Sequence, residues 1–599
     1  MCHLCYVYIY KYRNLSNIGL SIDPRYEYNF DPDNKVLSIE KSQNVLPESF
    51  WGEGIYSLTG IFGNNGAGKS NSIRFILDAV IYGSGSDANG IVVCEKEGRF
   101  IVYHPQDDNI KATCSISEID TDTKHEHPAM DIFYYSGHFN ADINSDDITT
   151  SQWGTSYNAS VNWKLFNDFE KYANIGPFRN HSISTYWESY ISQNNYRICQ
   201  LLVNDELRNI IKKFVFPNYI LFAPNRAGYY HFKYNRNPEI KIEKSILKII
   251  EEPKLTFGNP REITLALFIH HCLLNCLVES GISSLELVED WYKWLKTNKK
   301  VLPQFREFVR LQIAIDNIRP STIIMVEMLA KLDKSVRFNM SGGFYLDFEQ
   351  DKEKILGLMK SAHDKNIFLT SRYFDLYYSH EPDHGTTLSS GEQALLNLFS
   401  LIYDAVIVRP QEFSNIPAPQ LLIFDEAEIG FHPEWQRNYI SMLVDFVNAL
   451  SEKIRHKHYF QILITSHSPI LLSDIPLCCC NYLKLLYDEK KTKNVRDSQQ
   501  ETFASNVFNL YRDCFFLEDG LIGRFAEGKL KKLDEDIKNE DINEEDIKQR
   551  IGLIGDERIR QYYIYALKSS PVWKKLLIEE YNKRIKKLEE EINEQNRIS

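Results

Sequence analysis

A glycine-rich segment at residues 63–70 constrains the fold of this chain more than any other feature. The segment fits the pattern GxxxxGK[ST], and it follows an apolar-rich run at residues 56–62 that predicts a buried strand. The glycines of such a loop let its backbone NH groups turn inward around phosphates, and the positive end of the following helix adds to the attraction. We therefore expect every residue of the loop to contact a nucleoside triphosphate: Gly63, Asn64, Asn65, Gly66, Ala67, Gly68, Lys69 and Ser70.

Two side chains of this loop have specific expected tasks. Lys69 can reach the β- and γ-phosphate oxygens, and the Ser70 hydroxyl can hold Mg²⁺. A pattern this short also arises by chance in a chain of 599 residues, and the alternative is an ordinary glycine-rich turn. Three later segments favour the nucleotide site.

The first of these segments is LSSGEQ at residues 388–393, which precedes an apolar stretch typical of a buried helix. Ser389 and Glu392 stand in the S-x-x-E relation, so the structural alternative is a simple capping box. The same geometry leaves the Ser389 hydroxyl, the NH of Gly391 and a helix N-terminus facing outward. Such a group of donors suits an anion that another molecule brings.

The second segment, residues 419–428, is an apolar run that ends in adjacent carboxylates. This pattern is expected of a parallel strand whose carboxyl end opens onto a ligand crevice. Asp425 is placed to organise Mg²⁺, and Glu426 to orient or deprotonate an attacking water. The alternative is a strand that merely ends in a charged loop.

The third segment is an apolar run at residues 459–465, which predicts another buried strand and is followed by Ser-His-Ser-Pro. His467 would then lie where the carboxyl end of this strand meets the crevice, and a neutral imidazole there can bond a γ-phosphate or the attacking water. The alternative is a structural histidine. We expect His456 and His458, in the lead-in to the strand, to be solvated loop residues.

Taken in sequence order, these four motifs resemble the ABC-type ATPase heads of the RecF/SMC and OLD-like group. In that family two heads sandwich two ATP molecules, and the signature serine and glycine of one head contact the γ-phosphate held by the P-loop of the other. The resemblance implies ATP and Mg²⁺ as ligands, with Ser70 and Asp425 on the metal. It also implies that Ser389 and Gly391 act in trans, and that Glu426 and His467 complete the catalytic site.

Two further segments extend or limit the resemblance. Residues 428–436 look like the OLD-like and SMC-like continuation of the acidic strand rather than the transporter type. Residues 12–15 are similar to the early arginine loop of these heads, which makes Arg13 a candidate nucleotide contact. A clear glutamine loop is missing from the sequence, and residues 134–140 occupy a plausible equivalent strand end.

The spacing of the motifs predicts four regions. The interval between Ser70 and Leu388 is far longer than a compact head needs, so we expect an insertion. Helical patterns dominate residues 160–340, and strand patterns return at 343–348 and 373–378. We predict an α/β fold: a P-loop ABC-type ATPase head with a mainly helical insertion domain and a helical C-terminal tail. The expected boundaries are 1–155 for the N-terminal lobe with the P-loop, 156–340 for the insertion, 341–490 for the signature, acidic and histidine motifs, and 491–599 for the C-terminal helical region.

Composition limits the cellular location and the kinds of cross-link or metal site that we expect. No apolar run reaches the roughly 18 residues that a membrane helix needs, and the first residues lack the pattern of a secretory signal, so we expect a cytoplasmic protein without a membrane. Eleven cysteines without repeated CxxC pairs argue against a disulfide scaffold and a tetrahedral zinc site. The Cys2–Cys5 segment is more simply a buried strand.

Charge limits the contacts with nucleic acid. The net charge of −12 means that any such contact needs a local basic face. Residues 208–244 are rich in bases with interleaved aromatics, which could neutralise phosphates and stack on unpaired DNA or RNA bases. The alternative, which we prefer, is a sheet with core aromatics and solvated lysines.

The C-terminal region offers two further signals. Its final segment spaces Ile578, Tyr581, Ile585, Leu588 and Ile592 at alternating three and four residues. The pattern is too short to predict a coiled coil, and we expect it to dock on a neighbouring surface. The insertion has no long heptad array, unlike the arms of SMC proteins. Glu518, with residues 534–536, offers a carboxylate set for a metal.

These observations favour an ATP-hydrolysing head that forms a homodimer or higher oligomer around ATP and couples nucleotide state to sensing or processing nucleic acid. It resembles the ATPase subunits of bacterial anti-phage systems such as the Septu-type and retron-linked ones, with a separate nuclease or toxin as effector. The alternatives are an OLD-like ATPase with its own nuclease, a RecF/SMC-like DNA repair ATPase, and an interaction module in which ATP is only a dimerising ligand. A transporter ATPase fits the insertion poorly.

Overall fold

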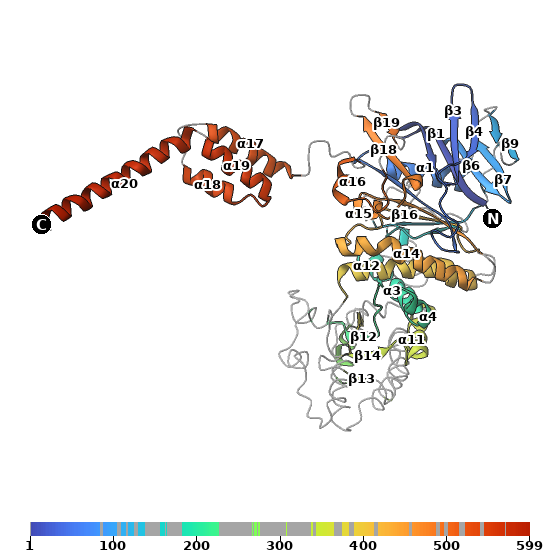
Figure 1. Ribbon diagram of the computed structural model, residues 1–599. Coiled ribbons are helices and arrows are strands. Elements are labelled where there is room, and N and C mark those ends of the chain that lie inside the picture. The colour runs from blue at the N-terminus through green and yellow to red at the C-terminus, as the bar shows by residue number, and fades with distance from the viewer. Residues whose placement is uncertain are drawn as a thin grey trace, which may run out of the picture. The chain divides into compact units, whose positions relative to one another are not determined.

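The structure is a computed structural model of the chain (Figure 1). It describes residues 2–83, 88–104, 110–114, 118–124, 128, 130–137, 156–161, 163–164, 183–211, 213–226, 230, 266, 269–271, 273–275, 307, 337–338, 343–364, 374–382, 388–412, 417–454, 458–486, 491–495, 501–513, 522–538, 544–569 and 571–598. The chain divides into two compact units, a main unit, Met1–Phe516, and a C-terminal unit, Leu517–Ser599.

A seven-stranded sheet forms the centre of the main unit, with the strand order β11-β10-β16-β17-β5-β18-β19. Six neighbouring strands of this sheet run parallel, and β19 pairs antiparallel with β18 at one edge. The strands are β5 (Ile55–Gly63), β10 (Ile132–Ser136), β11 (Tyr157–Asn158), β16 (Leu421–Asp425), β17 (Phe460–Thr465), β18 (Cys480–Leu486) and β19 (Lys491–Asn494). The predicted strands before the glycine-rich loop, the carboxylates and His467 are thereby confirmed.

The central sheet is buried on both faces, which explains why its strands are continuous apolar runs. Along β16, Leu421 and Ile423 join one core, which contains helix α1 (Lys69–Ile81). Leu422 and Phe424 join the other core, which contains α12 (Ser390–Tyr403) and α14 (Pro433–Lys453). Helices thus cover both faces, and Figure 1 shows α12 and α14 together on one of them.

Two small sheets extend the core on the α1 side. The first has five strands in the order β2-β1-β6-β7-β9, and the second has three in the order β3-β4-β8. The apolar runs at residues 90–94 and 99–103 form β6 and β7. The bounds are β1 (Cys2–Tyr12), β2 (Leu15–Ser21), β3 (Tyr26–Asp31), β4 (Val36–Lys41), β6 (Asn89–Lys96), β7 (Arg99–His104), β8 (Lys111–Cys114) and β9 (Ile119–Lys124).

A four-stranded antiparallel sheet, β13-β14-β12-β15, lies apart from the central sheet. In it β14 (Phe344–Asp347) and β15 (Phe374–Ser379) pair with the two edges of β12 (Tyr219–Pro224). These two strands therefore join a strand from the expected insertion range. The remaining strand is β13 (Arg337–Phe338), and helices α3 (Ile183–Leu202), α4 (Asp205–Ile210) and α11 (Lys352–Asp364) complete this part.

The basic and aromatic stretch at residues 208–244 is described only in part. Phe214, Phe216 and Phe222 are core residues, and Lys213 donates to the Ser441 hydroxyl at 2.9 Å. Residues 231–244 lie outside the described residues, as do most of the expected insertion helices between 227 and 336.

Among the described residues, one helix, Ser390–Gln411, is long and apolar enough to cross a membrane by length and composition. It comprises α12, a π-helical turn (Asp404–Val408) and most of α13 (Arg409–Glu412). Because 72% of its apolar window is buried inside the protein, it has the character of a core helix.

The C-terminal unit is helical, as predicted. Helices α17 (Arg524–Lys538), α18 (Glu544–Gly552) and α19 (Glu557–Ser569) pack around a small core that includes Leu533, Ile551 and Leu567. The last helix, α20 (Pro571–Ile598), runs on beyond this bundle (Figure 1). The main unit ends with short helices α15 (Pro469–Leu472) and α16 (Val507–Asp513) and a 3-10 turn (Leu477–Cys479).

Candidate nucleotide-binding site

Parallel strands bring three of the four sequence motifs to one edge of the central sheet: the glycine-rich loop, the acidic strand end and His467. Asp425 is in register with Thr465 on one side and with Ser136 on the other, and Thr465 is in register with Ile61. The carboxyl ends of β10, β16, β17 and β5 therefore meet, which is where ligands bind in open α/β sheets.

The glycine-rich loop needs glycine at two of its positions. Gly63 has a φ of 146°, and a Cβ there would lie 2.0 Å from the Leu483 carbonyl oxygen. Gly68, the residue that caps α1, has a φ of 96°, and a Cβ would lie 2.4 Å from the Leu15 side chain. At both positions the backbone has a conformation that residues other than glycine rarely adopt, and a neighbouring atom leaves no room for a Cβ. Glycine at these two positions therefore lets the loop backbone lead into α1 without a side chain in the way.

Lys69 is buried and lies across this loop. Its Nζ is 3.1 Å from the Gly63 carbonyl oxygen, 3.2 Å from that of Asn64 and 3.4 Å from Nδ1 of His467. Burial lowers the pKa of Lys69 to about 8, although the nearby carboxylates, Glu426 first, oppose this shift. Phosphate oxygens would restore the stabilisation that water no longer provides to the ammonium group.

Asp425 ends β16 as a buried carboxylate with three hydroxyl donors. Its Oδ1 accepts from Thr465 Oγ1 at 2.6 Å and from Ser70 Oγ at 3.3 Å, and its Oδ2 accepts from the Tyr134 hydroxyl at 3.3 Å. A carboxylate beside the hydroxyl that opens α1 is an oxygen donor set suited to Mg²⁺, which binds few protein ligands and keeps waters and phosphates. The predicted metal residues, Ser70 and Asp425, therefore lie together.

Glu426 and His467 also meet. Glu426 Oε1 is 3.0 Å from Nε2 of His467, whose Nδ1 faces Lys69. In a neutral ring these contacts place the proton on Nε2, because Nδ1 must accept from the ammonium group. The backbone of Glu426 has a φ of 50°, and its NH donates to Thr465 Oγ1 at 3.0 Å. A left-handed non-glycine residue at a strand end is typical of a functional position.

A third carboxylate, Glu428, follows the acidic strand and was not identified from the sequence. It is buried and accepts hydrogen bonds from the Ser466 hydroxyl and from the His467 NH, the latter at 3.3 Å. Burial raises the pKa of Glu428, and these two bonds oppose the shift. Glu428 thereby holds the backbone that carries the His467 ring.

The other residues missed by the sequence analysis are Thr465 and Tyr134. Both bond Asp425, and the signal that could have found Thr465 is its position as the last residue of the strand before His467. The expected glutamine-loop equivalent begins at Tyr134 and reaches Gly137 within the described residues; His138 and the two residues after it lie outside them.

The turn that contains Arg13 lies against the glycine-rich loop. Asn14 donates to the Gly66 carbonyl oxygen at 3.0 Å and accepts from Asn71 at 2.7 Å. Arg13 itself is exposed, has a φ of 50°, and donates to the Asn71 side chain at 3.4 Å. The turn is therefore beside the nucleotide motifs, although Arg13 contacts α1 rather than the loop.

The signature segment forms the capping box that the sequence allowed. Ser389 caps α12, its hydroxyl accepts from the Glu392 NH at 3.3 Å, and its own NH donates to the Glu392 carboxylate at 2.7 Å. Ser389 is exposed, whereas Gly391 is buried, and a Cβ at Gly391 would lie 2.7 Å from Trp435. The capping role is present. The expectation that Gly391 faces outward is not met, because the residue packs against Trp435, so the role in trans concerns the exposed serine.

His458 is a correction to the sequence analysis. We expected a solvated loop residue, but His458 is buried, and its Nε2 is 3.0 Å from the Pro419 carbonyl oxygen. The residue directly precedes β17, so its ring is enclosed next to the neighbouring strand, and burial lowers its pKa. His456 lies outside the described residues.

Among the described residues, one further group has the ligand types of a metal site: Cys5, Asp23 and Glu95. Arg25 already bridges its carboxylates, at 2.8 Å from Asp23 and 2.7 Å from Glu95. A guanidinium therefore supplies the positive charge that a metal would bring. At residues 534–536, Asp536 pairs with Arg550 at 2.7 Å, and Glu518 lies outside the described residues.

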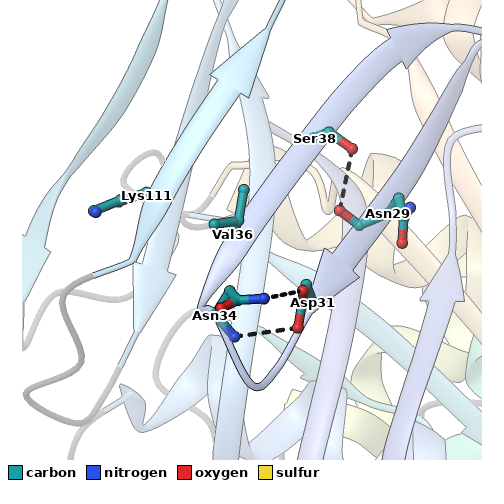
Figure 2. A pocket seen from close by; sticks show the side chains of 6 residues that line it. All are labelled: Asn29, Asp31, Asn34, Val36, Ser38 and Lys111. Carbon is teal, nitrogen blue, oxygen red and sulfur yellow. Dashed lines mark hydrogen bonds between the residues drawn. The ribbon is translucent and has the colours of Figure 1, made fainter.

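A hollow on the hairpin of β3 and β4 is shown in Figure 2, lined by Asn29, Asp31, Asn34, Val36, Ser38 and Lys111. Asp31 accepts from the Asn34 side chain at 2.7 Å, and Ser38 donates to the Asn29 carbonyl oxygen at 3.4 Å. These bonds belong to the turn and the strand pair, so they give the hairpin its shape and are no sign of a ligand.

The parallel central sheet and the helices on its two faces confirm the predicted α/β fold class, with the glycine-rich loop at the carboxyl edge of the sheet. Residues 300–473 match a family model described as "AAA domain, putative AbiEii toxin, Type IV TA system". The match contains the signature, the acidic strand and His467, but not residues 63–70. A search of curated proteins gives no match.

Solved structures give matches of low overall similarity. They include the recombination mediator protein RecF with ATPrS, at 14% identity over 82% of this chain and 98% of that chain, with a TM-score of 0.21. They also include the Smc head domain with an extended coiled coil, bound to the C-terminal domain of ScpA, from Pyrococcus furiosus, at 12% identity over 83% and 96%, with a TM-score of 0.22. Scores at this level carry no argument, and the fold class rests on the sheet and its motifs.

Proposed function

We propose that the chain is an ATP-hydrolysing head that dimerises around ATP and Mg²⁺. The observation that carries the proposal is the convergence of three distant segments: Ser70 Oγ is 3.3 Å from Asp425, and Glu426 is 3.0 Å from His467. Lys69 Nζ joins the two pairs, at 3.4 Å from His467. Each member has the chemistry that phosphoryl transfer to water requires.

Each residue has one task in this proposal. The loop NH groups and Lys69 bind and orient the phosphates, and Ser70 with Asp425 would hold Mg²⁺, which neutralises charge on the phosphates when bound. Glu426 accepts the proton of the attacking water, as a carboxylate within reach of the phosphate edge. His467 orients Glu426 through Nε2.

The second half of the site comes from another copy of the chain. Ser389 is exposed at the start of α12, where its hydroxyl and the helix N-terminus present donors to an anion. In the proposal, the exposed Ser389 hydroxyl contacts the γ-phosphate bound by the partner subunit. Dimerisation is therefore a consequence of ATP binding.

We further propose that nucleotide state controls a response to nucleic acid in bacterial anti-phage defence, in the cytoplasm and with a separate nuclease or toxin. The support is the matched family, whose description names a toxin and a type IV TA system. The described residues support a separate effector more than an intrinsic nuclease, because Asp536 is bonded to Arg550. Metal-dependent DNA cleavage by the purified chain would favour the nuclease alternative instead.

The test is Glu426→Gln, with Glu434→Gln as the matched control. Glutamine keeps the size of the side chain but accepts no proton, so we expect ATP turnover to fall by roughly a hundredfold or more. ATP binding should persist, and ATP-dependent dimers should accumulate. Glu434 lies in the first turn of α14 on the surface, and its replacement should leave turnover unchanged. Wild-type turnover in Glu426→Gln would refute the assigned base.

A further inference from the structure

The C-terminal helix α20 has a row of apolar side chains that remain in solvent. Ile578, Tyr581, Ile585 and Leu588, here called the α20 stripe, are 61%, 60%, 52% and 51% exposed. Their spacing of three, four and three residues puts them on one face of the helix. A solvent-facing helix surface is normally polar, so a continuous apolar row indicates a contact surface.

The rest of α20 and of its unit confirms that the stripe is not part of the local core. The helix is charged between the stripe positions, with exposed residues such as Lys583, Lys586 and Lys587. The core of the C-terminal unit is formed by buried residues of α17, α18 and α19, and it includes none of the four stripe residues. The bundle is therefore packed without them, and the stripe is free to bind something else.

The pattern fits a second copy of the same helix. Alternating steps of three and four residues average 3.5, the repeat that keeps an apolar seam facing a partner helix in a left-handed coiled coil. With Ile578 and Ile585 at the a positions, Tyr581 and Leu588 occupy the d positions. β-branched residues at a with leucine at d favour two strands.

Charge complementarity supports the same occupant. In this heptad frame Arg584 is at a g position, Glu589 at an e position and Glu591 at a g position. If the two helices run parallel, Arg584 faces Glu589 of the partner subunit. If they run antiparallel in the register that sets Ile585 opposite Leu588 of the partner subunit, Arg584 faces Glu591 of the partner subunit. Two-fold symmetry forms either pair twice. A second copy of α20 therefore offers both the apolar seam and the opposite charges.

We propose that α20 is a dimerisation helix that pairs with α20 of a second copy in the absence of nucleotide. This interface is separate from the ATP-dependent contact of the heads. It keeps two heads in one molecule between cycles, so their meeting around ATP becomes an intramolecular event at high effective concentration. After hydrolysis the heads then separate, while the two copies stay joined through α20.

The experiment measures the molar mass of the nucleotide-free, full-length chain by light scattering over a range of concentrations. We expect twice the 70.0 kDa of one chain for the wild type, and 70.0 kDa for Ile585→Glu/Leu588→Glu at concentrations where the wild type is dimeric. The control is Leu553→Glu, which puts the same charge at an apolar side chain that is 82% exposed outside α20. Circular dichroism of each variant shows whether helix content is retained.

A charge exchange then tests the heptad frame. Arg584→Glu alone should weaken the dimer by more than about tenfold, because it places like charges opposite each other. Adding Glu589→Lys should restore the dimer if the helices are parallel, and adding Glu591→Lys should restore it if they are antiparallel. Restoration by neither would contradict the frame and overturn the proposal.

Two other results would also overturn it. A wild-type chain that is monomeric without nucleotide means that the stripe is covered by another part of its own chain or by another protein. A dimer that persists in Ile585→Glu/Leu588→Glu means that another surface holds the copies together. Neither result affects the proposed ATPase, because that proposal is tested by turnover and by dimers that require ATP.

Discussion

The carboxyl edge of the central sheet and the start of α12 contain the two halves of the proposed site, and they differ in how their polar groups are satisfied. At the sheet edge, Ser70, Thr465 and Tyr134 all bond one buried carboxylate, that of Asp425. At the start of α12, Ser389 and Glu392 bond each other at the surface. The first half is assembled within one chain, whereas the second has only its own cap.

This contrast indicates which half of the proposed site needs another molecule to complete it. A buried, fully bonded group is already in place before any ligand arrives, so changes there should remove binding or chemistry in each copy. An exposed cap has a small structural role of about 1 kcal/mol, so any larger effect of changing it must come from what it meets. The following predictions test this contrast, from the largest effect to the smallest.

Replacement of Asp425 by asparagine should have the largest effect. The change keeps the shape but removes the negative charge next to Ser70, so Mg²⁺ binding should weaken and ATP turnover should fall about a thousandfold. Turnover as a function of Mg²⁺ concentration measures the effect. Asp375→Asn is the matched control, because Asp375 bonds Asn225 in the separate four-stranded sheet. A loss of similar size in both variants would contradict the assignment.

Ser389→Ala should separate the capping role from the role in trans. Removal of one donor to the phosphate in the transition state should lower turnover about a hundredfold, while the lost cap costs about 1 kcal/mol of stability. Asn204→Ala removes a similar cap from α4, where Asn204 accepts from the Leu207 NH at 3.3 Å. Thermal melting should report similar losses for both. Equal turnover in the two variants would mean that Ser389 only caps α12 and has no role in trans.

The lowered pKa of Lys69 predicts that ATP affinity depends on pH. Without ligand the pKa is about 8, and bound phosphate favours the charged ammonium, so binding takes up a proton above pH 8. Affinity should therefore fall as pH rises through 8, by about tenfold at pH 9. Calorimetry at several pH values measures it. In Lys69→Arg the guanidinium stays charged, so the decline should disappear.

Glu428→Ala should have the smallest effect, because Glu428 acts through the position of His467. We expect turnover to fall several-fold and the melting temperature to drop, since a buried NH without its partner costs about 1–3 kcal/mol. Glu428→Gln should recover most of the loss, because both bonds go to Oε1, an oxygen that glutamine also has. Equal losses in the two variants would indicate that the charge, not the position of His467, matters.

The sequence predicted the parts of the fold that depend on local pattern. The strands before Gly63, Asp425 and His467 were predicted from apolar runs, and the start of α12 from the relation of Ser389 to Glu392. These signals are local because strand burial and helix capping depend on neighbouring residues. For the same reason the fold class could be predicted without any distant contact.

Features that depend on distant contacts were missed. The bond from Tyr134 to Asp425 joins residues from different strands, and β14 and β15 pair with β12, which precedes them by more than a hundred positions in the chain. The burial of His458 follows from the strand beside it rather than from its polar neighbours. The polar residues around His458 in the sequence therefore did not predict its exposure. The segment that leads into the neighbouring strand buries the ring and supplies its hydrogen-bond partner.

The contact between Gly391 and Trp435 gives the start of α12 an optical reporter. Because glycine has no side chain, the indole of Trp435 lies directly against the backbone of this segment, with Phe214 beside the ring. Indole fluorescence responds to the polarity and charge of its surroundings. The emission of this tryptophan should therefore change colour or intensity whenever another subunit brings phosphate to Ser389, without any added dye.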